Sequence, residues 1–193
     1  MATQTDPFQL PAGLPVPVDD GAAAHLMGAL IPDVRLQATD GRLVSLARLG
    51  NSRTVVYAYP RTGRPGEPEL TPDWDSIPGA RGCTPEACAF RDHHAALKAA
   101  GAGVFGLSTQ SIPHQQELVN RLHLPFPVLS DEDLALTQAM RLPTFRAAGQ
   151  TLLRRLTLVI RIAEWNMFGT RCFRPISMPN AYLNGYAVVR AGK

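Results

Sequence analysis

Short apolar runs alternate with helix-forming segments along most of the chain, and this alternation constrains the fold more than any other feature. The sequence predicts strands in apolar, β-branched or aromatic runs at residues 54–59, 104–107, 128–129 and 152–160. It predicts helices at residues 85–100, 113–122 and 132–140. Strands that alternate with helices build a parallel or mixed sheet covered on both faces. We therefore expect an α/β fold with a central mixed sheet flanked by helices.

The segments around this alternation carry their own patterns. Residues 1–33 hold five prolines and predict an extended arm, interrupted by a short helix around 21–30, ahead of a domain over residues 34–193. Residues 34–46 predict a hairpin with Asp40 and Gly41 in a type I′ turn. The Pro- and Gly-rich segment 61–82 predicts a long loop, which is uncommon in a compact domain unless it has a function.

The C-terminal segment, residues 161–193, has weaker patterns. An edge strand is predicted at 165–168, and Asn184-Gly185 predicts a small hairpin between 182–183 and 186–189. Three interruptions, Pro175, Pro179 and Gly185, argue against a long terminal helix.

Composition excludes several classes of protein. A chain of 193 residues with 45% hydrophobic and 18% charged residues suits one folded domain. The net charge of +3 comes from scattered residues without a basic run, so we expect no nucleic-acid partner. The apolar stretches are far shorter than the roughly 18 residues of a membrane span, and the first residues lack a secretory pattern. The sequence therefore predicts a cytoplasmic protein without a membrane partner.

Two of the three cysteines lie where the long loop meets a predicted helix, in Gly82-Cys83-Thr84-Pro85-Glu86-Ala87-Cys88. A helix N-terminus presents free N–H groups and the positive end of the helix dipole, which stabilise an anion. We therefore expect a lowered pKa for the Cys83 thiol, which would make it reactive. Arg81 and Arg91 add positive charge nearby.

The spacing of Cys83 and Cys88 limits what the pair can do. On an intact helix their Cα atoms would lie about 8–9 Å apart on nearly opposite faces, whereas bridged cysteines lie about 4.4–6.8 Å apart. A disulfide between them would require the first helical turn to unwind.

Two other uses of these cysteines stay open at this point. One is a metal site formed with a nearby histidine such as His93, although five-residue steps along a helix do not converge, so no metal or other cofactor is expected. The other is a pair of inert buried thiols, which is also our interpretation of Cys172.

Three sequence segments resemble the peroxiredoxins, most closely the bacterioferritin-comigratory or Q type. They are Tyr59-Pro60, residues 82–92 (GCTPEACAFRD) and residues 104–110 (VFGLSTQ). The hairpin at 34–46 and residues 125–131 (PFPVLSD) are similar as well, so the resemblance covers about residues 31–160.

The resemblance implies a thioredoxin-like fold and an atypical two-cysteine thiol peroxidase acting on hydrogen peroxide and organic hydroperoxides. It implies Cys83 as the peroxidatic thiol, Cys88 as the resolving thiol of the same subunit, and Arg155 as the arginine that holds the thiolate and the peroxide. It also implies a thioredoxin- or glutaredoxin-like reductant, and we expect a monomer or a weak homodimer.

The chain departs from this family before its active-site cysteine. The family has Pro seven residues and Thr or Ser three residues before that cysteine, where this chain has Ser76 and Ala80. Thr62, Ser76 or Thr84 could supply the missing hydroxyl. The departures favour a second hypothesis, a disulfide exchanger or redox sensor without peroxidase activity. We also expect the 61–82 loop, with Trp74, to cover the thiol pocket.

Overall fold

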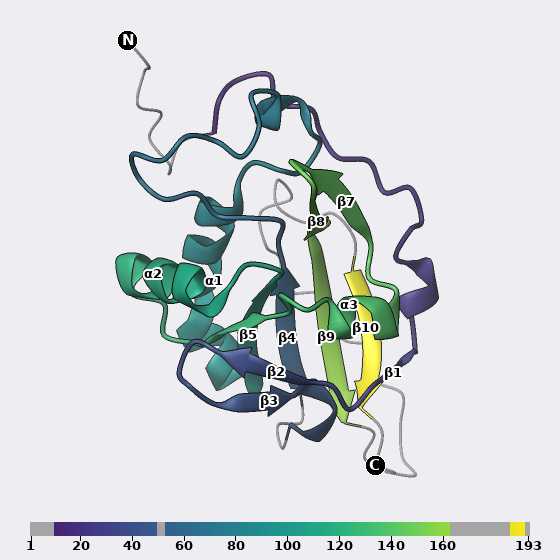
Figure 1. Ribbon diagram of the computed structural model, residues 1–193. Helices are drawn as coiled ribbons and strands as arrows, with labels where there is room; N and C mark the ends of the chain where they lie inside the picture. Colours follow the sequence, from purple (N-terminus) through teal and green to yellow (C-terminus); the bar gives the residue numbers. More distant parts are fainter. Residues whose placement is uncertain (1–9, 50–52, 163–185, 192–193) are drawn as a thin grey trace.

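The computed structural model describes residues 10–49, 53–162 and 186–191, which form a mixed eight-stranded sheet with helices on both faces (Figure 1). The strands lie in the order β1-β10-β9-β4-β5-β6-β2-β3. Their bounds are β1 Leu30–Ile31, β2 Arg35–Ala38, β3 Leu43–Ser45, β4 Arg53–Ala58, β5 Ala102–Ser108, β6 Val128–Ser130, β9 Leu156–Ile162 and β10 Tyr186–Ala191. A separate antiparallel pair consists of β7 (Thr144–Ala147) and β8 (Gln150–Leu153).

Three α-helices and three short 3-10 turns complete the described structure. The helices are α1 (Cys83–Ala99), α2 (Ile112–Leu122) and α3 (Ala135–Met140). The 3-10 turns are η1 (Ala24–Leu26), η2 (Leu46–Arg48) and η3 (Trp74–Ser76). The predicted helix at 132–140 is therefore shorter, because Leu134 adopts a positive φ of 58° directly before α3.

The central strand β4 separates two hydrophobic cores. Its side chains alternate between faces, so Val55 and Tyr57 belong to the core under α1 and α2, whereas Val56 and Ala58 belong to the core under α3 and η1. Figure 1 shows α1 and α2 on one side of the sheet and α3 on the other. This two-sided burial confirms the predicted α/β class with a mixed sheet.

The predicted hairpin is present as β2 and β3, but its turn differs from the prediction. Gly41 alone has a positive φ, of 85°, and its N–H donates to the carbonyl of Ala38. A type I′ turn needs two positive-φ residues, so the predicted type is wrong. The chain instead uses a three-residue connection, which places only the glycine in the left-handed region.

The predicted strand at 152–160 is in fact two strands. Pairing with β7 ends at Leu153, and pairing with β4 begins at Leu156. The prediction joined two apolar runs across Arg154 and Arg155, the charged pair that separates the two strands. Arg154 and Arg155 lie between the end of β8 and the start of β9.

An early strand, β1, and the last strand, β10, pair at one edge of the sheet. The predicted helix at 21–30 is only the short turn η1, followed by β1, which pairs in parallel with β10. Strand β10 also pairs in parallel with β9 over six residue pairs. The predicted features at 165–168 and 182–183, and Cys172, lie outside the described residues. No helix in the described part of the chain is both long and apolar enough to cross a membrane.

Candidate active site

Cys83 is the first residue of α1, and the residue before it explains why the helix begins there. Gly82 has φ of 98°, a left-handed conformation that side chains disfavour, and its carbonyl accepts the N–H of Glu86 at 3.0 Å. A β-carbon at Gly82 would lie 3.6 Å from Leu10 and 3.7 Å from Arg155. These are ordinary van der Waals distances, so the left-handed backbone conformation, and not the approach of Arg155, is what favours glycine here.

Arg155 reaches the start of α1 from the break between β8 and β9. Its Nη2 donates to the Cys83 Sγ at 3.3 Å and to the carbonyls of Arg81 at 2.9 Å and Gly79 at 3.2 Å. Its Nη1 forms an ion pair with Glu86. Only 6% of the Arg155 side chain is exposed, so the guanidinium is fixed by its partners rather than by water.

The Cys83 sulfur is buried and its thiol donates to the carbonyl of Ala80 at 3.5 Å. Burial raises the pKa of the Cys83 thiol; the charge of Arg155 and the backbone N–H of Arg61 oppose this effect, and Glu86 adds to it. The prediction of a lowered Cys83 pKa is therefore wrong for the reduced protein, in which α1 is intact. Desolvation outweighs the favourable charges at the helix start.

Glu86 is the site residue that sequence reasoning missed. Its side chain is 3% exposed and pairs with Arg155. Burial raises its pKa from 4.5 to about 7, although Arg155 acts in the opposite direction. The spacing offered a clue, because residues three apart share a helix face and Glu86 follows Cys83 by three.

Cys88 lies on the same helix and both thiols are free. It is half-buried against the core under α1 and α2, and burial raises its pKa. Because α1 is regular from Cys83 onward, the five-residue separation places the two cysteines too far apart for a bond, as expected from helix geometry.

The three hydroxyls predicted as partners of Cys83 have different surroundings. Within the described residues, the Cys83 sulfur interacts with the Ala80 carbonyl, the Arg155 guanidinium and the backbone N–H of Arg61. Thr84, which is buried next to it in sequence, is not among these partners. The Thr62 hydroxyl donates to the Gln110 side chain at 3.3 Å. Ser76 lies in η3.

Gln110 holds the loop segment that faces the thiol. Its side-chain oxygen accepts the N–H of Thr62 at 2.9 Å, and its side-chain nitrogen donates to the Thr62 carbonyl at 3.1 Å. His114 contacts the same carbonyl at 2.8 Å. This network fixes the backbone next to Arg61, whose N–H faces the Cys83 sulfur.

The 61–82 loop takes part in the site through its backbone. Trp74 is buried in a small cluster with Ala80, Ala147 and Leu152, so it anchors the loop to the β7–β8 pair. The side chain of Arg81 forms ion pairs with Asp75 and, at 2.5 Å, with Glu69.

Two further predictions concern Arg91 and a metal site near His93. Arg91 pairs with Asp92 and donates to the Leu122 carbonyl at 3.0 Å. In the described ranges, no three or more His, Cys, Asp or Glu side chains gather where a metal ion could bind, and the His93 ring contacts the Ala89 carbonyl.

Comparison with solved structures identifies the class of fold. Peroxidoxin BcpB from Mycobacterium tuberculosis is 25% identical, with a TM-score of 0.55 over 70% of this chain and 78% of that one. Peroxiredoxin Q from Xanthomonas campestris is 23% identical, with a TM-score of 0.53 over 70% of this chain and 80% of that one. The protein thus has a thioredoxin-like fold, as the resemblance implied.

The family follows from the sequence comparison. The Redoxin profile matches residues 26–163, so the chain belongs to the Redoxin family. It is 37% identical to the chloroplastic peroxiredoxin Q of Oryza sativa subsp. japonica over 105 residues, 54% of this chain and 41% of the relative. It is 36% identical to that of Sedum lineare over 105 residues, 54% of this chain and 48% of the relative. The chain spans less than half the length of these two relatives, and the resemblance to the Q type is confirmed as a distant relationship.

Proposed function

We propose that the protein is a thiol peroxidase that reduces hydrogen peroxide and organic hydroperoxides with Cys83. The observation that supports this most directly is the 3.3 Å contact between the Cys83 sulfur and the buried Arg155 guanidinium. A cation fixed at a buried sulfur stabilises both the thiolate and the negative charge that moves onto a leaving oxygen.

In the first step the Cys83 sulfur attacks the terminal peroxide oxygen. A sulfur–oxygen bond forms, the oxygen–oxygen bond breaks, and Cys83 becomes a sulfenic acid. The thiol proton finishes on the leaving oxygen, which departs as water or an alcohol. Arg155 and the Arg61 N–H are the donors available to the developing charge.

In the second step Cys88 attacks the sulfenic sulfur. A disulfide forms and water leaves, which conserves both atoms and electrons. Because α1 separates the two sulfurs, the first turn must unwind, and this breaks the contacts of Arg155 with Cys83 and Glu86.

A dithiol protein of the thioredoxin or glutaredoxin type would return the disulfide to two thiols by exchange. We propose a cytoplasmic setting, where such reductants keep thiols reduced. We also propose that the protein acts as a monomer or a weak homodimer, since both cysteines belong to one helix.

The test is stopped-flow oxidation by hydrogen peroxide combined with peptide mapping of blocked thiols. Wild-type protein should lose two thiols rapidly as a Cys83–Cys88 bridge. Cys83→Ser should lose turnover, and Cys88→Ser should consume one equivalent of peroxide and then stop. Cys172→Ser is the matched control and should behave as wild type.

Two outcomes would overturn the proposal. Unchanged peroxide turnover in Cys83→Ser would remove the role of Cys83. Slow, unselective oxidation of all three cysteines would favour a disulfide exchanger or redox sensor on the same fold.

A further inference from the structure

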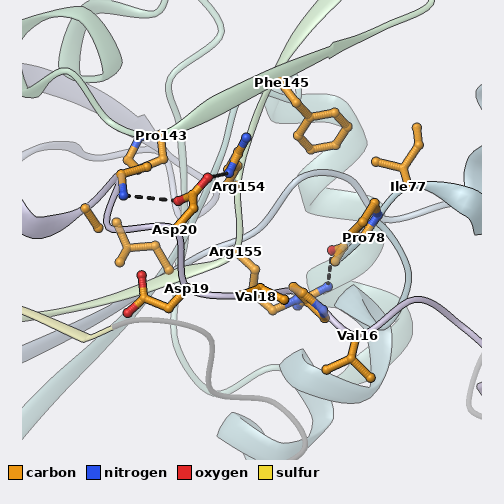
Figure 2. Close-up of a pocket in the computed structure, with 15 residues that line it drawn as sticks. Val16, Val18, Asp19, Asp20, Ile77, Pro78, Pro143, Phe145, Arg154 and Arg155 are labelled. Atoms are coloured by element: carbon orange, nitrogen blue, oxygen red, sulfur yellow. Dashed lines mark hydrogen bonds and ion pairs between the residues drawn. The ribbon is translucent and has the colours of Figure 1, made fainter.

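A cavity lies against Arg155, and the N-terminal arm forms one of its walls (Figure 2). Its volume is about 370 Å³, within the range of small-molecule sites. The arm contributes residues 16–20 and 22–23, the long loop contributes residues 77–79, and β7 contributes Phe145. Arg155 lines the same cavity and hydrogen-bonds the Cys83 sulfur.

The arm is held in place by specific contacts. The Asp20 carboxylate pairs with Arg154 at 2.6 Å and accepts the N–H of Ala22 at 3.1 Å. Pro17 lies so close to the loop that a β-carbon on Gly79 would be 3.4 Å from its ring. The arm therefore sits at the loop whose Gly79 carbonyl binds Arg155.

The cavity combines an apolar part, formed by the arm, the long loop and β7, with the charged side chains of Asp19, Asp20 and Arg154. Val16 is 81% exposed and Val18 is 82% exposed, and both line the cavity together with Ile77, Pro78 and Phe145. Covering such side chains with an apolar group removes their surface from water, which is favourable. Arg155 is the cation at this apolar site that also touches the thiol.

Another cavity, which Arg61 lines, has a different character. It is lined mainly by polar side chains, including Arg61, Gln110 and His114. An apolar group would desolvate these side chains without pairing them, which is costly. The arm-walled cavity is therefore the better place for an apolar group.

We propose that the arm, through Val16 and Val18, forms a specificity wall that binds the apolar tail of a bulky organic hydroperoxide whose peroxide group lies at Arg155 and Cys83. The inference rests on the proposed peroxidase function. It adds that residues far from α1 in sequence select the substrate. The arm-walled cavity should favour hydroperoxides with an aromatic or branched alkyl group over hydrogen peroxide.

The experiment compares single-turnover oxidation of Cys83 by cumene hydroperoxide and by hydrogen peroxide. In Val18→Asp the ratio of the two rate constants should fall about tenfold relative to wild type, because a charge replaces apolar contact area. Leu43→Asp is the matched control, since Leu43 is 63% exposed on β3, and it should keep the wild-type ratio. An unchanged ratio in Val18→Asp overturns the proposal.

A binding measurement separates this inference from the proposed function. The alcohol product 2-phenyl-2-propanol is titrated by NMR into Cys83→Ser protein with and without Val18→Asp. Binding that Val18→Asp weakens about tenfold supports the apolar site, even if neither peroxide oxidises wild-type Cys83, a result that would overturn the peroxidase function alone. Equal binding in both proteins, or none, overturns the site.

Discussion

At the residue scale, one buried arginine serves two competing partners. Arg155 donates to Cys83 and pairs with Glu86, and both partners are almost fully buried. A buried ion pair costs desolvation energy that its attraction repays only in part. The raised pKa of Glu86, about 7, reflects this balance, since burial acts more strongly than Arg155.

Glu86 should make the stability of the protein depend on pH. Because its pKa is raised from 4.5 to about 7, the folded state binds the proton more tightly than the unfolded state. The stability from this group is therefore full below about 4.5 and is lost as the pH rises through about 7. Urea midpoints of wild type should fall between pH 5 and pH 8 more than those of Glu86→Gln, which cannot titrate.

Glu117→Gln is the control for that measurement. Glu117 pairs with Arg121 on α2, and 31% of its side chain is exposed. The urea midpoint of Glu117→Gln should therefore fall between pH 5 and pH 8 by as much as that of wild type. An equal fall in wild type and Glu86→Gln would contradict the role given to Glu86.

At the scale of elements, the long loop and α1 form one unit. The loop is attached to the β7–β8 pair by Trp74, which is buried with Ala80 and Leu152. From there the loop presents the Ala80 carbonyl to Cys83 and the Arg81 carbonyl to Arg155. That the loop with Trp74 covers the thiol pocket stays a prediction, whereas its backbone carbonyls at Gly79 and Arg81 bind Arg155.

Trp74→Ala should loosen this unit. Removing a buried aromatic side chain should lower the free energy of unfolding by about 3–5 kcal/mol. It should also speed the reaction of Cys83 with a disulfide reagent such as DTNB, because the Ala80 segment loses its anchor. Met27→Ala, at a residue 58% exposed, is the control and should change stability by less than about 0.5 kcal/mol.

The measurements are urea unfolding and the rate of thiol release at fixed pH. Wild-type stability in Trp74→Ala would contradict the anchoring role. A large loss of stability with unchanged thiol reactivity would mean that the Ala80 segment is held by other contacts.

At the scale of the whole molecule, strand β10 completes the sheet. It lies between β9 and β1 and pairs in parallel with both. Without it, the edge of β9 would present unpaired N–H and carbonyl groups, which promote association between chains.

A chain lacking residues 186–193 should therefore melt at a lower temperature and scatter light at high concentration. Removing only residues 192–193 leaves β10 intact and is the control. Melting is followed by circular dichroism, and association by light scattering at two concentrations. Identical behaviour of the two truncated chains would argue against a structural role for β10.

The local chemistry of the sequence determined the α/β class, the presence of α1 near residues 85–100 and the separation of Cys83 from Cys88, because turn residues, apolar spacing and helix geometry act over a few residues. The start of α1 at Cys83, two residues earlier than predicted, was not determined by it. Glu86 was within reach of the same reasoning, since it shares a helix face with Cys83.

Only the tertiary structure decided the break at Arg154 and Arg155, the turn at Gly41, the raised pKa of Cys83 and the placement of the N-terminal arm beside Arg155. Strand ends depend on which neighbour a strand pairs with, and a pKa depends on burial by residues distant in the chain. These properties arise from contacts between remote segments, so they exist only once the chain has folded.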